Sequence, residues 1–218
     1  MHAKPGKVVG IEIQSDQTLG KDGGFLSIRR VRLKNRRDDG SLSAEYLCDF
    51  VDRPRGLDAV VVVVYTRRNG RVEVLLRQGL RPSLILGRTP PLPSPFFTEV
   101  VAGILEVTDG DTAGAVANRA AAEVREEAGF IVPADRVRQL GATSVPAPGI
   151  LPERLYLCAV EIADPGQQGL LEGDGSPMEE GARTWWMELS DAIAACVSGE
   201  IEDAKTELCL RRLRDELG

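Results

Sequence analysis

Histidine is almost missing from this sequence: the only one is His2, beside the N-terminus. Without a histidine in its interior, the chain cannot supply a Ser-His-Asp triad, a Cys-His pair or a histidine-based metal site. Its four cysteines lie far apart and form no CxxC pair, so neither a zinc knuckle nor a redox dithiol is indicated. Any chemistry must therefore depend on carboxylates, lysine or the backbone.

Long apolar runs and a basic excess are also missing. The longest apolar run, residues 59–64, is far shorter than the roughly 20 residues of a membrane helix, and the first residues lack the apolar core of a signal peptide. We therefore expect a cytoplasmic protein that does not associate with membranes. A net charge of -6 argues against a nucleic-acid-binding surface, which normally shows a basic excess. An acidic protein that handles phosphates usually needs divalent cations between them.

The pattern of the chain predicts an α+β fold. At 218 residues with 43% hydrophobic side chains, the chain can bury a full core. Residues 59–65 are typical of a central strand buried on both faces, and residues 71–77 follow as its hairpin partner across Asn69-Gly70. Further strands are predicted over 154–162 and 183–188, and helices over 112–128, 190–198 and 203–217. A mixed central sheet follows from this order.

Two other segments are distinctive. Residues 25–51 alternate charged and apolar side chains around a turn at 38–41, which predicts an antiparallel hairpin. Its cationic face is either a solvated sheet surface or a phosphate-binding surface. We assign residues 1–55 to an N-terminal β extension and residues 56–218 to the main domain. Residues 81–97 hold five prolines, which predicts a long loop with neither helix nor central strand.

Three glutamates, Glu123, Glu126 and Glu127, have the i, i+3, i+4 spacing that places side chains on one face of a helix. Like charges so placed repel one another unless a cation lies between them. Carboxylate oxygens are the ligands that Mg²⁺ or Mn²⁺ prefers, and these ions take substrate phosphates as further ligands. Taken alone, the pattern is also compatible with a solvated acidic helix face.

The wider context of these glutamates resembles the Nudix box, G-x5-E-x7-R-E-U-x-E-E-x-G-U, in which U is aliphatic or aromatic. Residues 102–106, Ala-Gly-Ile-Leu-Glu, resemble its first part. Residues 122–130, Ala-Glu-Val-Arg-Glu-Glu-Ala-Gly-Phe, match its second part at every defined position but one. The chain is thereby identified as a member of the Nudix hydrolase family.

The sequence departs from this box in two places. The spacing between its two parts is five residues longer than in the family, so the first glutamate of the box has no direct counterpart, and Asp109 or Asp111 could replace it. Ala122 stands where the family has an arginine that organises the glutamates. Arg119 lies four residues before Glu123 on the same helix face, so it could supply the missing cation.

Segments outside the box resemble the branch of ADP-ribose and nucleoside-diphosphate-sugar pyrophosphatases. These are the proline-containing residues 146–153 and the C-terminal residues 201–206. The resemblance implies a Nudix α/β/α sandwich, a homodimer joined partly through the N-terminal extension, and Mg²⁺-dependent cleavage of a diphosphate. The products would be a nucleoside monophosphate and a sugar phosphate.

The same resemblance implies roles for single residues. Expected metal ligands are the carbonyl of Ala102 and the carboxylates of Glu123 and Glu127, with Glu126 ligating or bridging a second ion. The base that activates water is expected from the acidic loop 166–181, and the candidates are Glu179, with Glu180 in support, and Glu153 as the alternative. Candidates for substrate binding are Arg77, Arg81, Glu99, Arg29 and Phe25, the last by stacking on the base. We expect Glu127 to face the surface.

Two other functions are compatible with this reading. A catalytically weakened Nudix domain that senses a nucleotide sugar is favoured by Ala122 and the enlarged loop, and opposed by the retention of all three glutamates. A purely structural interaction domain would account for the N-terminal extension but not for the carboxylates.

Overall fold

The computed structural model describes residues 8–19, 25–53, 55–90, 93–173 and 175–218. It consists of two compact units. One comprises residues 1–57 with 147–153, and the other comprises residues 58–146 with 154–218. We describe each unit by itself.

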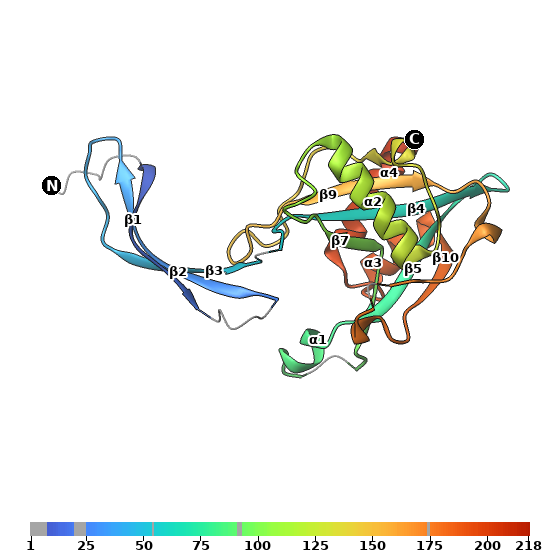
Figure 1. The fold of residues 1–218 in the computed structure, drawn as a ribbon, viewed down its shortest axis with the longest axis horizontal. Coiled ribbons are helices and arrows are strands. Elements are labelled where there is room, and N and C mark those ends of the chain that lie inside the picture. Colours follow the sequence, from blue (N-terminus) through green and yellow to red (C-terminus); the bar gives the residue numbers. More distant parts are fainter. Residues whose placement is uncertain (1–7, 20–24, 54, 91–92, 174) are drawn as a thin grey trace. The chain divides into compact units, whose positions relative to one another are not determined.

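The N-terminal unit is a three-stranded antiparallel sheet (Figure 1). Its strands are β1 (Val8–Leu19), β2 (Ser27–Arg37) and β3 (Tyr46–Asp52), in the order β1-β2-β3. The expected hairpin corresponds to β2 and β3, whereas β1 was not predicted. Cations of β2 pair with acidic residues: Arg30 lies 2.6 Å from Asp49, and Arg32 lies 3.0 Å from Glu45. These exposed pairs favour a solvated face over a free phosphate-binding surface.

The second unit is built on a mixed seven-stranded sheet in the order β10-β5-β4-β9-β8, with β6 beside β5 and β7 beside β4. Of the described strand pairs in this sheet, β4 and β9 are parallel and the others are antiparallel. The strands are β4 (Ala59–Arg68), β5 (Arg71–Leu80), β6 (Phe96–Glu99), β7 (Val101–Ile104), β8 (Arg138–Gln139), β9 (Leu155–Glu161) and β10 (Arg183–Glu188). Positive φ angles at Asn69 and Gly70 form the expected tight turn between β4 and β5.

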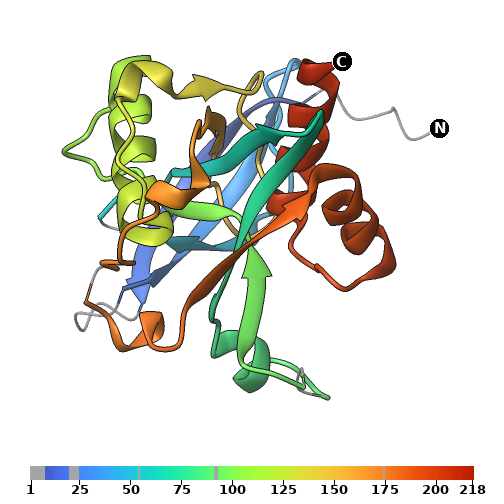
Figure 2. The same cartoon turned by 90° about the vertical axis from the view of Figure 1, so that its right-hand side faces the viewer.

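Helices cover both faces of this sheet, as Figure 2 shows. Helix α2 (Ala113–Ala128) packs on one face, where Val60, Val62 and Val64 point toward it. Helices α3 (Leu189–Ser198) and α4 (Ala204–Leu217) cover the other, where Val61 and Val63 are buried. All five valines have zero exposure, and each contributes about 1.5–3 kcal/mol of hydrophobic stabilisation. The expected α+β fold, an α/β/α sandwich with a mixed central sheet, is confirmed.

The ends of α2 follow the capping rules. The side chain of Thr112 accepts a hydrogen bond from the N–H of Ala115, which starts the helix, and Gly129 ends it with φ of 73°. Gly129 has a second reason to be glycine, because a Cβ there would lie 2.6 Å from the carbonyl oxygen of Gly169. The acidic loop therefore approaches the end of α2 closely.

The proline-rich segment differs from the expectation. Residues 83–86 form the short helix α1 (Ser83–Leu86), so the prediction that residues 81–97 contain no helix was wrong. Pro82 occupies the N-cap of this helix, where a backbone N–H would have no hydrogen-bond partner within the helix. A proline at this position is therefore compatible with the helical turn. Among the described residues, no helix is long and apolar enough to cross a membrane.

Candidate active site

Two glutamates of α2 are buried against strand β7. Glu123 is 5% exposed and Glu127 is 9% exposed, so the expectation that Glu127 faces the surface was wrong. The N–H of Ala102 donates to Oε2 of Glu127 at 3.0 Å. A Cβ at Gly103 would lie only 1.6 Å from Oε1 of Glu123. The Ala-Gly pair of the box is therefore the backbone seat on which both carboxylates rest.

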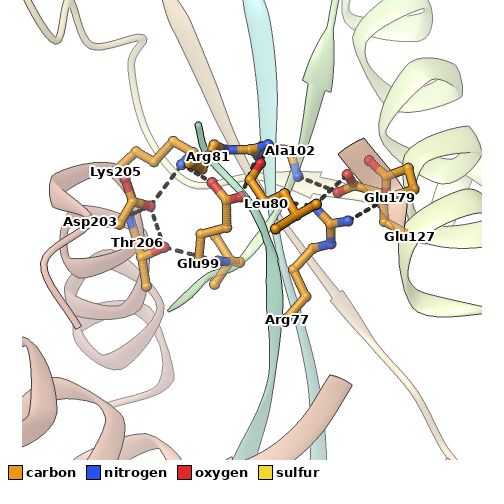
Figure 3. Close-up of polar contacts among 11 residues, drawn as sticks. Arg77, Leu80, Arg81, Glu99, Ala102, Glu127, Glu179, Asp203, Lys205 and Thr206 are labelled. Carbon is orange, nitrogen blue, oxygen red and sulfur yellow. Dashed lines mark hydrogen bonds and ion pairs between the residues drawn. The ribbon is translucent and has the colours of Figure 1, made fainter. Parts of the chain in front are cut away.

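Arg77 lies between Glu127 and Glu179 (Figure 3). These three residues, together with Glu123, form one cluster. The side chain of Arg77, on β5, is only 2% exposed. Nη1 lies 2.8 Å from Oε1 of Glu127, and Nη2 donates to Oε2 of Glu179 at 2.6 Å. Nη1 also lies 3.8 Å from Oε1 of Glu99. The sequence indicated Arg77 for substrate binding, but these contacts favour a role in balancing the charge of the glutamates.

Arg119 forms the expected ion pair with Glu123, one helical turn away on α2. Its side chain is 25% exposed, so it reaches the cluster from the solvent side. The cluster thus has two arginines, Arg119 from helix α2 and Arg77 from strand β5. The geometric part of the Arg119 hypothesis is confirmed, and its effect on metal binding stays a prediction.

The two buried carboxylates have perturbed protonation equilibria. Burial raises the pKa of Glu127 to about 8, against the opposing effects of Arg77 and of the hydrogen bond from Ala102. Burial also raises the pKa of Glu123, an effect that Arg119 opposes. Both shifts show that the cations present do not fully offset the cost of burying two neighbouring charges. Further positive charge in this cluster would be stabilising.

The acidic loop closes one side of a pocket of about 240 Å³ next to the cluster. The N–H groups of Gly173 and Gly169 donate to the carbonyls of Glu126 and Gly129, at 3.0 and 2.7 Å. The loop is thereby anchored to the last turn of α2, which brings Glu179 to the same pocket as Glu127. The lining residues are Arg77, Glu126, Glu127, Leu171, Glu172, Gly173, Glu179, Gly181 and Ala182.

A second polar network surrounds Glu99, which is 1% exposed. Arg81 contacts its Oε1, and Lys205 donates to its Oε2 at 2.6 Å. Lys205 also bonds Asp203, the N-cap of α4, at 2.8 Å. This network ties the start of α4 to β6 and places Arg81 beside the cluster (Figure 3). The sequence indicated Arg81 and Glu99 but not Lys205, whose only signal was its position inside the resembling segment 201–206.

Four candidates remain. Arg29, Phe25 and Glu153 belong to the N-terminal unit, where Glu153 pairs with Arg53 at 2.9 Å. Glu180 is exposed, beside Glu179. The roles expected for these four residues stay predictions.

The donor set of this cluster is of the kind that a hard divalent cation prefers. Its donors are carboxylate oxygens, and both Glu123 and Glu127 pack against the backbone, where a side chain at Gly103 would overlap the carboxylate of Glu123. Among the described residues, no three His, Cys, Asp or Glu side chains are already arranged around a common ion position. Arg77 and Arg119 pair with Glu127 and Glu123, so the residues fit a divalent cation provided that these two arginine side chains adjust.

Comparison with known proteins gives distant structural neighbours. No family model matches the chain, and no curated protein matches it. The solved structures similar to it include an Ap4A hydrolase of C. elegans, with a TM-score of 0.46 and 19% identity over 75% of this chain and 99% of that one. Another is the Nudix domain of Shewanella oneidensis NrtR in complex with ADP-ribose, with a TM-score of 0.47 and 15% identity over 75% and 89% of the two chains. At this distance, the function must be argued from the chain's own residues.

Proposed function

We propose that this protein is a Mg²⁺-dependent pyrophosphohydrolase of the Nudix family that cleaves ADP-ribose or a nucleoside diphosphate sugar into a nucleoside monophosphate and a sugar phosphate. One observation carries the proposal. Glu123 and Glu127 are buried together on the Ala102-Gly103 seat, and Glu179 reaches the same cluster from a loop. A merely structural helix face would gain nothing from burying these charges.

The roles of the residues follow from their places. Glu123, Glu127 and the carbonyl of Ala102 would hold the ion, with Glu126 at the pocket wall available to a second one. When bound, Mg²⁺ would neutralise the charge of the diphosphate and favour an activated water. Glu179 would accept the proton of the attacking water, because it is a loop carboxylate that contacts Arg77 and lines the same pocket as Glu127. Glu180 would support it.

For substrate binding, Arg81 and Glu99 are the candidates in the second unit, and Phe25 and Arg29 are those in the N-terminal unit. Arg81 is 34% exposed and can reach an anionic group, while Glu99 fixes its guanidinium. Phe25 is 57% exposed and is the candidate to stack on the base, with Arg29 on the same unit.

A homodimer is part of the proposal. Ile13, Ile28 and Leu47 on the N-terminal sheet are 64%, 48% and 50% exposed, and a three-stranded sheet with so many exposed apolar residues gains stability from a partner. Light scattering at micromolar concentration is expected to give twice the mass of one chain. A monomeric mass under these conditions would contradict this part of the proposal.

The sensor alternative has an observation in its favour, since arginines pair with the two glutamates that would bind the ion. A panel of ADP-ribose, ADP-glucose, UDP-glucose, GDP-mannose and NADH, assayed with Mg²⁺, separates the two functions. Release of AMP, UMP or GMP from the corresponding compound supports the enzyme. Binding of one of these compounds without its cleavage supports the sensor.

Arg119 offers a test of how the glutamates are organised. If its guanidinium holds Glu123 in place before the ion arrives, Arg119→Ala is expected to raise the Mg²⁺ concentration needed for half-maximal activity by about tenfold, an effect of roughly 1–2 kcal/mol. Because Arg119 reaches the cluster from the solvent side, it can move aside when the ion binds. Adding Ala122→Arg to this variant is expected to restore part of the loss. An unchanged metal requirement in Arg119→Ala would refute the idea.

A further inference from the structure

Both carboxylate oxygens of Glu127 are already engaged within the protein. Oε2 accepts the hydrogen bond of the Ala102 N–H at 3.0 Å, and Oε1 lies 2.8 Å from Nη1 of Arg77. A cation that binds to Oε1 must share this oxygen with a guanidinium. Arg77 and the expected ion are therefore in conflict at one atom.

Arg77 cannot withdraw into solvent as a surface arginine would. Its side chain is 2% exposed, and it packs on the backbone of Gly79, where a Cβ would lie 3.3 Å from Nη1. Within the described part of the chain, Nε and Nη1 are buried and have no hydrogen-bond acceptor of suitable geometry. Buried donors without partners are costly. The guanidinium is thus held by the hydrogen bond of Nη2 to Glu179 and by the charges of Glu127 and Glu99.

We propose that Arg77 is an internal competitor of the divalent ion: it balances the charge of Glu127 when no ion is bound and is shifted toward Glu179 when one binds. This inference rests on the proposed function, because it takes Glu127 as a metal ligand. A fixed positive charge in contact with a ligand oxygen opposes a dication at that oxygen strongly in a buried site. Glu179, at 2.6 Å, and Glu99, at 3.8 Å, are the anions within reach of the displaced guanidinium.

The competition has a consequence for the candidate base. When Arg77 loses Glu127, its remaining close partner is Glu179 on the acidic loop. Ion binding at α2 would then strengthen the attachment of this loop to β5. Arg77 is accordingly a positioning residue that couples the occupancy of the metal site to the placement of Glu179.

The direction of an affinity change tests the proposal. A competitor weakens Mg²⁺ binding, whereas an organising residue strengthens it. Arg77→Gln removes the charge and keeps a hydrogen-bond donor for Glu127, so its Kd for Mg²⁺, measured by calorimetry without nucleotide, is expected to be about tenfold lower than that of the wild type. Arg71→Gln is the matched control: it removes the same charge from the same strand, but that side chain is 70% exposed and pairs with Glu188. Its Kd is expected to stay within about twofold of the wild type.

A second measurement needs no substitution that could impair folding. In wild-type protein labelled with ¹⁵N-arginine, the Nε signal of Arg77 is expected to shift on saturation with Mg²⁺, while that of Arg71 stays in place. An unshifted Arg77 signal, or an equal or weaker Mg²⁺ affinity in Arg77→Gln, overturns the competition while leaving the metal site intact. Absence of Mg²⁺ binding in both the wild type and Arg77→Gln overturns the competition together with the proposed function. Binding in the variant alone supports the competition in its strongest form.

Discussion

Glu127→Gln is expected to lower turnover on the preferred nucleotide sugar by roughly a hundredfold or more at saturating Mg²⁺, with the protein still folded. The amide keeps the shape of the side chain and an acceptor for the Ala102 N–H, whose bond to Oε2 is 3.0 Å long. It removes the charge that an ion at this position requires. Arg77 retains Glu179 as a partner at 2.6 Å, so the change leaves no isolated buried arginine.

Steady-state kinetics over a range of Mg²⁺ concentrations, together with thermal unfolding, measures both parts of this expectation. Glu207→Gln is a suitable control, because Glu207 forms an i,i+4 pair with Arg211 on α4 and belongs to neither polar network of the site. Turnover of Glu127→Gln within threefold of the wild type, in a folded protein, would remove Glu127 from the metal ligands.

Gly103→Ala is the second change with a large expected effect. The new methyl group would lie 1.6 Å from Oε1 and 1.9 Å from Cδ of Glu123, so the carboxylate must leave its seat. The atoms that must move are the end of a flexible side chain, so the fold can adapt, while the ligand is displaced from the cluster. We expect Mg²⁺ affinity and turnover to fall by about a hundredfold, with a loss of about 1–3 kcal/mol in the free energy of unfolding.

Gly114→Ala is the matched control for this change. It adds the same methyl group near the start of α2, where nothing lies within 4 Å of the new atom. Alanine is a better helix former than glycine, so the free energy of unfolding of this variant is expected to be about 0.5–1 kcal/mol higher than that of the wild type. The variant is expected to keep full activity. If Gly103→Ala behaves like Gly114→Ala in metal binding, the seat described for Glu123 has no functional importance.

Local patterns sufficed for the elements whose signals are contained in a short stretch of sequence. The valine run of β4, the Asn69-Gly70 turn and the helix α2 each depend on neighbouring residues alone, and each was predicted correctly. Strand β1 was missed, and helix α1 was excluded because prolines surround it. A proline at the N-cap allows the helical turn that a proline in a helix interior would prevent.

The candidate site could be predicted only in part, because its contacts join distant segments. The helical spacing of the glutamates and the Arg119–Glu123 pair follow from local geometry. The contact of Arg77 with Glu179 spans 102 residues, and that of Glu99 with Lys205 spans 106. Contacts between such distant residues leave no periodic pattern in the sequence. For this reason Arg77 was interpreted as a substrate ligand, and Lys205 was not singled out. The burial of Glu127 was missed for the same reason, since it depends on the position of β7.

The most direct test of the proposed function is the release of AMP and ribose 5-phosphate from ADP-ribose by the wild-type protein, with Mg²⁺ and with EDTA. If ADP-ribose is not the preferred compound of the substrate panel, the same measurement is made on the one that is. The proposed function predicts equimolar release of the two products with Mg²⁺, no release with EDTA, and a loss of both products in Glu127→Gln. Binding of these compounds in the presence of Mg²⁺ without release of a nucleoside monophosphate from any of them would contradict it.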